Sequence, residues 1–161
     1  MRLHLLLQKK LIDPVVGLLR QGITAEKIAL GMAVGIVIGI FPVIGSTTLL
    51  CTLAAIALRL NLPAVQVVNY LVYPLQIAFL IPFFQFGAWL FNIEPLPLSA
   101  SQLIAMFQAD FWGAIRQLWG TTMRAIVAWG LICLPAVTGL YYGLRPLLKR
   151  LDRKKPSPVL P

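Results

Sequence analysis

Residues 28–91 form an almost uninterrupted apolar block, and this block limits the possible folds more than any other feature of the chain. Arg59 is the only charged residue within it. The block is long enough for two membrane spans, since a helix needs about 20 apolar residues to cross the hydrocarbon core. The 161-residue chain is 59% hydrophobic and 12% charged, whereas soluble domains carry about 25% charged residues. We therefore predict an all-α integral membrane protein, with residues 1–161 forming a single membrane domain.

Two prolines interrupt the block and predict helix breaks. Pro42, followed by Gly45, separates two stretches that would be about 20 Å long as helices, against a membrane core of about 30 Å. These lengths favour a first broken, re-entrant hairpin over residues 28–58 that returns to its side of entry, rather than one kinked span. Pro74 repeats the pattern and predicts a second broken helix block over residues 62–91.

The flanking regions complete the predicted layout. We expect amphipathic helices on the cytoplasmic surface over residues 1–27, an outer amphipathic connector over 92–124, a full transmembrane helix over 125–144 and a basic flexible tail over 145–161. In the transmembrane helix, Trp129 is interpreted as an interface anchor. The formal net charge of +9 is concentrated at the two ends. Basic flanks mark the cytoplasmic side, so both termini are predicted to be cytoplasmic in a multi-pass protein, in contact with membrane lipids.

Gly31, Gly35 and Gly39 recur every four residues and predict a helix face for close packing. Glycines at this spacing let a second backbone approach and gain dispersion contacts. The partner is either the chain's own hairpin or a second protomer in a homo-oligomer. Gly45 is expected to take a positive φ in the turn after Pro42.

Ser46, Thr47 and Thr48 follow this turn and open a helix. Backbone amides at a helix N-terminus can bind an anion such as a lipid phosphate; the alternative is that these side chains cap their own helix. Arg59 has two interpretations as well, as a ligand for an acidic headgroup or as an anchor at the membrane interface.

Uncharged amide side chains accumulate along the apolar block. The five amides are Asn61, Gln66, Asn69, Gln76 and Gln85, and we select Asn61, Asn69 and Gln76 among them as candidate ligand-binding residues. Their ordinary role in a membrane is hydrogen bonding between helices. Their number also suggests a partly polar cavity.

The residues available for catalysis are few. The single histidine, His4, is far in sequence from any nucleophile, and Glu94 and Asp110 are too widely separated to form a catalytic pair. Cys51 and Cys133 match no metal motif. We therefore predict no enzyme activity, no catalytic residues, no metal and no cofactor. A nucleic-acid partner is also not expected, because no basic face with interleaved aromatic residues occurs outside the membrane segments.

Several motifs resemble a known family. Residues 33–42 (AVGIVIGIFP), residues 58–63 (LRLNLP), Pro74 and residues 86–90 (FGAWL) are similar to the bacterial membrane family named domain of unknown function 2062. Arg59 and Asn61 match its arginine-x-asparagine element. The chain departs from the family's pattern at the second proline, where Tyr73 and Gln76 replace an asparagine and a threonine. The resemblance implies a bacterial inner-membrane protein of unassigned activity, in a family sometimes joined to glycosyltransferase domains.

Two functions are compatible with these features. The first is binding or translocation of an anionic amphipathic ligand, such as a lipid-linked phosphate, with Ser46–Thr48 offering amides, Arg59 the countercharge, and Asn61 and Asn69 orienting the headgroup. The alternative is a non-catalytic scaffold that assembles a membrane enzyme, such as a glycosyltransferase, through the glycine face.

Overall fold

A computed structural model describes residues 24–95 and 100–153. These residues form only helices and turns, which confirms the predicted all-α class: α3 (Ala25–Gly39), α4 (Thr47–Ala57), α5 (Leu62–Leu90), α6 (Ala100–Ala109) and α7 (Phe111–Arg153). By length and composition, α5 and α7 are apolar and long enough to cross a membrane. The surface helices predicted over residues 1–27 lie outside the described residues, except for residues 24–27 at the start of α3. The end of the predicted tail, residues 154–161, also lies outside them.

Helices α3 and α4 are joined by a turn and lie where the first broken hairpin was predicted, over residues 28–58. The Thr24 hydroxyl caps α3 by accepting the backbone N–H of Lys27 at 3.4 Å. The helix ends at Gly39, and Gly45 takes a φ of +88°, which confirms the turn expected after Pro42. At about 1.5 Å per residue, α3 and α4 are roughly 22 Å and 16 Å long, so each is shorter than a membrane core of about 30 Å.

The predicted break at Pro74 is wrong. Helix α5 runs through both Pro74 and Pro82 without interruption and is 29 residues long. The Asn61 side chain caps it by accepting the N–H of Ala64 at 2.9 Å. A proline removes one backbone hydrogen bond, but ending the helix there would expose several backbone groups to lipid. The continuous helix therefore has the lower free energy.

The boundaries predicted after residue 92 are also wrong. The connector divides into α6 and the first part of α7, because Asp110 starts a new helix by accepting the N–H of Gly113 at 2.9 Å. Helix α7 then continues for 43 residues, through Pro135 and Pro146, to Arg153. The basic segment 145–153 is thus helical rather than flexible. Lysine and arginine have a high helix propensity, so a basic segment can continue a helix.

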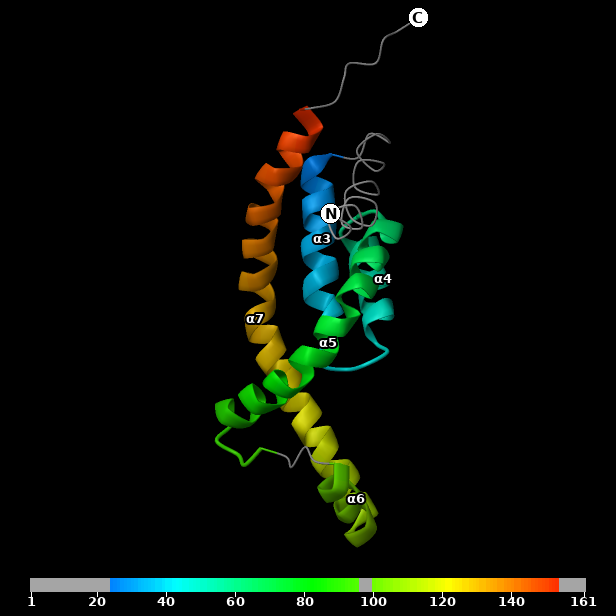
Figure 1. Ribbon diagram of the computed structural model, residues 1–161, viewed down its shortest axis with the longest axis vertical. Coiled ribbons are helices and arrows are strands. Elements are labelled where there is room, and N and C mark those ends of the chain that lie inside the picture. Colours follow the sequence, from blue (N-terminus) through cyan, green and yellow to red (C-terminus); the bar gives the residue numbers. More distant parts are fainter. Residues whose placement is uncertain (1–23, 96–99, 154–161) are drawn as a thin grey trace, which may run out of the picture.

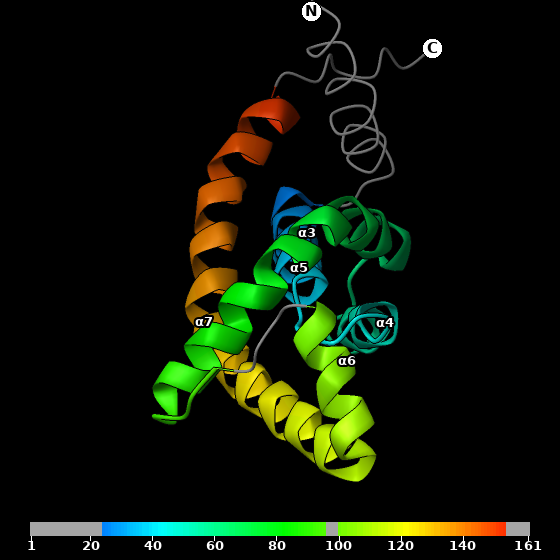
Figure 2. The same ribbon diagram turned by 60° about the horizontal axis from the view of Figure 1, so that its bottom comes forward.

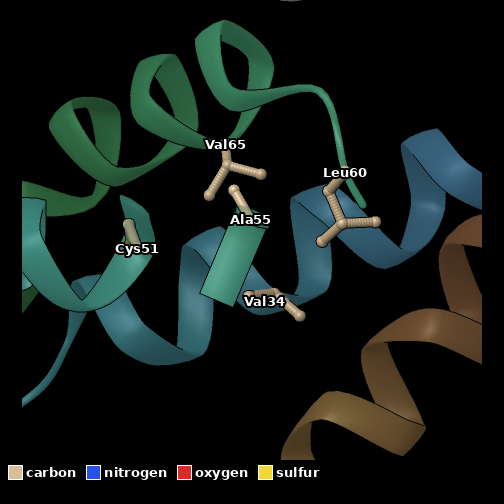
Figure 3. Close-up of a cluster of buried hydrophobic side chains, with 5 residues drawn as sticks. All are labelled: Val34, Cys51, Ala55, Leu60 and Val65. Carbon is tan, nitrogen blue, oxygen red and sulfur yellow. The ribbon is translucent and has the colours of Figure 1, made fainter. Parts of the chain in front are cut away.

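Helix α3 is the centre of the packing. It contacts α4, α5 and α7 (Figures 1 and 2), and its small residues allow these neighbours to approach from several sides. One core cluster joins α3, α4 and the start of α5 (Figure 3), through Val34, Cys51, Ala55, Leu60 and Val65. Helix α6 packs against the first part of α7, at the end of the molecule opposite Arg153.

Large apolar side chains cover the outside of the bundle. Leu49, Ile56 and Leu134 are each more than half exposed, and Leu134 reaches 77%. A soluble protein rarely exposes so much contiguous apolar surface, whereas a lipid environment favours it.

Candidate functional site

The glycine face of α3 is occupied by α5 of the same chain. A Cβ atom at Gly35 would lie 3.0 Å from the Val65 carbonyl oxygen, and one at Gly39 would lie 3.3 Å from Asn69 Oδ1. Gly31 is less crowded, at 3.5 Å from Val65 Cγ2. The two backbones approach closely because these positions lack side chains. The face proposed for a second protomer or a scaffold partner is therefore covered within the chain, by α5 rather than by the other arm of the hairpin.

Gln76 supports the turn that follows α3. Its side chain is 1% exposed, and its Nε2 donates to the carbonyl oxygens of Phe41 at 2.8 Å and Val43 at 3.4 Å. These carbonyls have no helical partner because the helix has ended. Gln76 Oε1 is buried without a hydrogen-bond partner among the described residues. The amide thus provides a donor for backbone carbonyls that the end of α3 leaves without a helical partner.

Trp129 of α7 also hydrogen-bonds a backbone carbonyl near the end of α3. Its Nε1 donates to the Val37 carbonyl at 2.9 Å, and its ring meets Phe41 edge-on, with ring centroids 4.9 Å apart. The interpretation of Trp129 as an interface anchor is therefore wrong, since the indole points into the bundle. Sequence reasoning missed this contact. The only signal was an N–H donor near the middle of an apolar helix.

A second polar cluster connects α4 with α5. Gln66 Nε2 donates to the Thr48 carbonyl and to Thr52 Oγ1, both at 2.9 Å. Asn69 Nδ2 donates to Gln66 Oε1 at 3.3 Å. Neither Gln66 nor Thr52 was among the candidate residues. Such bonds between helices are the usual role of amides in a membrane bundle.

The start of α4 differs from a side-chain-capped helix. Ser46 makes no capping hydrogen bond, and its hydroxyl instead donates to the Val43 carbonyl at 2.8 Å. Thr47 is buried, and Thr48 contributes its carbonyl to the cluster around Gln66. These residues serve the turn and the α4–α5 contact.

Arg59 occupies an unusual backbone position between α4 and α5. Leu60 N–H donates to the Ala55 carbonyl at 2.8 Å and Arg59 N–H to the Ile56 carbonyl at 3.2 Å. This is the Schellman pattern of helix ends, whose central residue is left-handed and usually glycine. Arg59 has a φ of +52° there. Its side chain is exposed and forms no ion pair with any residue in 24–95 or 100–153.

Helix α5 ends in the same motif, which provides a comparison. Ile93 N–H donates to the Ala88 carbonyl at 3.0 Å, and the left-handed residue is Asn92, with a φ of +51°. Asparagine tolerates this region better than other non-glycine residues do. Arginine has no such advantage, so Arg59 is the exception of the two.

The candidate ligand-binding residues do not assemble into one site. Arg59 and Asn61 lie after the last turn of α4, whereas Ser46–Thr48 lie at its first turn, roughly 16 Å away along an 11-residue helix. Asn69 and Gln76 are buried against the hairpin, where their Nδ2 and Nε2 atoms donate to other groups of the chain. A single headgroup cannot contact both ends of α4.

Basic residues accumulate where α3 begins and α7 ends. Glu26 accepts a hydrogen bond from Lys149 at 2.8 Å and forms an ion pair with Arg145 at 3.5 Å. The bond from Lys149 lowers the pKa of the Glu26 carboxyl below its ordinary value. This pairing joins the first turn of α3 to the end of α7.

Comparison with other proteins defines the family without adding an activity. No curated protein and no solved structure matches the chain. The model of a bacterial family described as "Uncharacterized protein conserved in bacteria (DUF2062)" matches residues 10–156. Since this match covers more than half of the sequence, the chain belongs to the DUF2062 family.

Proposed function

We propose that this protein crosses the bacterial inner membrane twice, with α5 leading outward and α7 returning. The hairpin α3–α4 is re-entrant, since its arms are too short to span. Support comes from the distribution of charge. The upper half of Figure 1 contains the start of α3, the end of α4 and the end of α7. These three segments carry an excess of basic residues, namely Lys27, Arg59, Arg145, Lys149 and Arg150. By the positive-inside rule, this end faces the cytoplasm, and so do both termini.

We further propose that the protein binds the phosphate of an anionic lipid or lipid-linked ligand at this cytoplasmic end, with Arg59 as the primary contact. The observation that carries the proposal is the exposed side chain of Arg59 on a left-handed backbone, without an ion-pair partner among the residues that the structure describes. An L-residue costs about 1–2 kcal/mol in this conformation, and glycine avoids the cost. A guanidinium offers paired N–H donors that match a phosphate.

The geometry limits the proposal to binding. Asn61 lies two residues from Arg59, but its side-chain oxygen already caps α5. The deeper amides of Gln66 and Gln76 donate to Thr48 and to the turn after α3. These groups support the hairpin and are not available as a polar route, so translocation is not part of the proposal.

The test compares two arginines at the same end. Full-length protein in nanodiscs is titrated with phosphatidylglycerol or a long-chain isoprenoid monophosphate. We expect Arg59→Gln to reduce phosphate binding about tenfold, because a charge-assisted hydrogen bond contributes about 1.5–3 kcal/mol. Arg150→Gln removes the same charge from the last turns of α7 and should retain binding. Equal losses in both variants would reduce the effect to general surface charge and contradict a site at Arg59.

A further inference from the structure

An open surface pocket of about 410 Å³ lies at the C-terminal end of α5, at the opposite end of this helix from Arg59. Its size falls within the range of small-molecule sites. The residues that line it belong to the last turns of α5 and the segment that follows: Gln85, Ala88, Trp89, Asn92, Ile93, Glu94 and Pro95.

The chain reversal after α5 forms this pocket. Residues 85, 88 and 89 follow the i, i+3, i+4 spacing within α5 and therefore share one helix face, while Asn92 lies beyond the end of the helix. The left-handed Asn92 turns the chain, and the bond from Ile93 N–H to the Ala88 carbonyl folds residues 93–95 back beside that face. Ala88 contributes only a methyl group to the lining.

The groups around the pocket favour a positive charge. The lining residue Glu94 carries a carboxylate, and Gln85 and Asn92 carry amides. None of these three side chains has a hydrogen-bond or ion-pair partner within the described segments 24–95 and 100–153. Trp89 is 73% exposed, so a ligand can contact its indole ring. A cation gains from an indole face and from the negative end of a helix dipole.

We propose that this pocket binds a primary ammonium headgroup. Such a group has three N–H donors for the Glu94 carboxylate and the amide oxygens of Gln85 and Asn92, while its charge and methylene groups contact Trp89. A quaternary ammonium would lack the donors. The source is either a membrane lipid with an ethanolamine headgroup or a soluble amine. This site is independent of the phosphate site at Arg59.

The experiment measures lipid binding to the purified full-length protein by native mass spectrometry. We expect phosphatidylethanolamine to bind at least tenfold more tightly than phosphatidylcholine, and Glu94→Gln to remove about tenfold of this affinity, since charge-assisted hydrogen bonds are the stronger ones. Trp89→Leu should also weaken binding of both lipids. Asp110→Asn is the control, because it removes an acid that does not line the pocket, and asparagine can still cap α7.

A second arm separates the two sources. Competition by free ethanolamine would extend the site to soluble amines, and lack of competition would restrict it to the lipid headgroup. Equal binding of the two lipids, or a Glu94→Gln variant with unchanged affinity, would overturn the proposal and leave Trp89 as an ordinary interface anchor.

Discussion

The side chain of Gln76 donates to the backbone carbonyl of Phe41 at 2.8 Å, across 35 positions of the chain. This bond joins the middle of α5 to the turn in which α3 has just ended. Because such a turn cannot be hydrated in lipid, the contact explains how a broken hairpin can persist inside the bundle.

Replacing Gln76 by leucine should therefore destabilise the protein. The change leaves the Phe41 carbonyl without the Gln76 donor, whereas the Val43 carbonyl keeps the Ser46 hydroxyl at 2.8 Å. A buried unsatisfied group costs about 1–3 kcal/mol. Thermal unfolding in detergent measures the effect. Gln85→Leu, at an exposed position of the same helix, is the control and should shift the Tm little. Equal shifts in both variants would show that Gln76 does not support the turn.

The glycine face makes a graded prediction. Gly35→Ala places a methyl group 3.0 Å from the Val65 carbonyl, and this crowding should cost about 1–3 kcal/mol. Gly31→Ala meets only an ordinary contact at 3.5 Å and should be close to neutral. Unfolding of the two variants under identical conditions tests the difference. A Gly31→Ala variant as unstable as Gly35→Ala would mean that the α3–α5 distances are not those described.

Arg59→Gly should stabilise the fold by about 1 kcal/mol while it removes phosphate binding. Glycine accepts the left-handed conformation without the penalty that arginine incurs. Asn92→Gly, in the equivalent position after α5, should change stability less, because asparagine already tolerates this region. The measurement is denaturant unfolding beside the lipid titration. If Arg59→Gly were destabilising, the side chain would have a structural contact, and the case for a ligand would fail.

Stability should decrease at acidic pH through Glu26. Its pKa is lowered in the folded protein, chiefly by the hydrogen bond from Lys149. A lowered carboxyl pKa contributes stability above the unfolded value, and this contribution disappears as the pH falls through the folded pKa. The Tm should therefore decrease as the pH falls below 4.5, the ordinary pKa of a glutamate side chain. Glu26→Gln should reduce this dependence, and an unchanged pH profile would contradict the pairing.

The two proline breaks show how far sequence reasoning reaches. Pro42 is followed within six residues by Gly45, which can take a positive φ, and by Ser46 and Thr47, which suit the start of a helix. Pro74 has neither companion, and the helix continues through it. A nearby glycine is not sufficient for a break, however, because α7 continues through Pro135 although Gly139 follows it.

The candidate site was predicted in part for a related reason. Turn residues and glycine spacing depend on neighbours in sequence, so Gly45 and the glycine face of α3 could be found in advance. The bonds from Gln66 to Thr52 and from Trp129 to Val37 join different helices. Which donor reaches which acceptor depends on how the helices pack, and neighbouring residues in the sequence do not determine this packing.

The most direct test of the re-entrant hairpin is the side from which the turn between α4 and α5 can be labelled. Cysteines introduced singly at Lys27, Leu58 and Asn92, after replacement of Cys51 and Cys133 by alanine, are exposed in cells to a membrane-impermeant maleimide before and after permeabilisation of the inner membrane. We predict that Lys27→Cys and Leu58→Cys react only after permeabilisation, and Asn92→Cys before it. Labelling of Leu58→Cys from the outside would contradict the account, because α3 and α4 would then cross the membrane together.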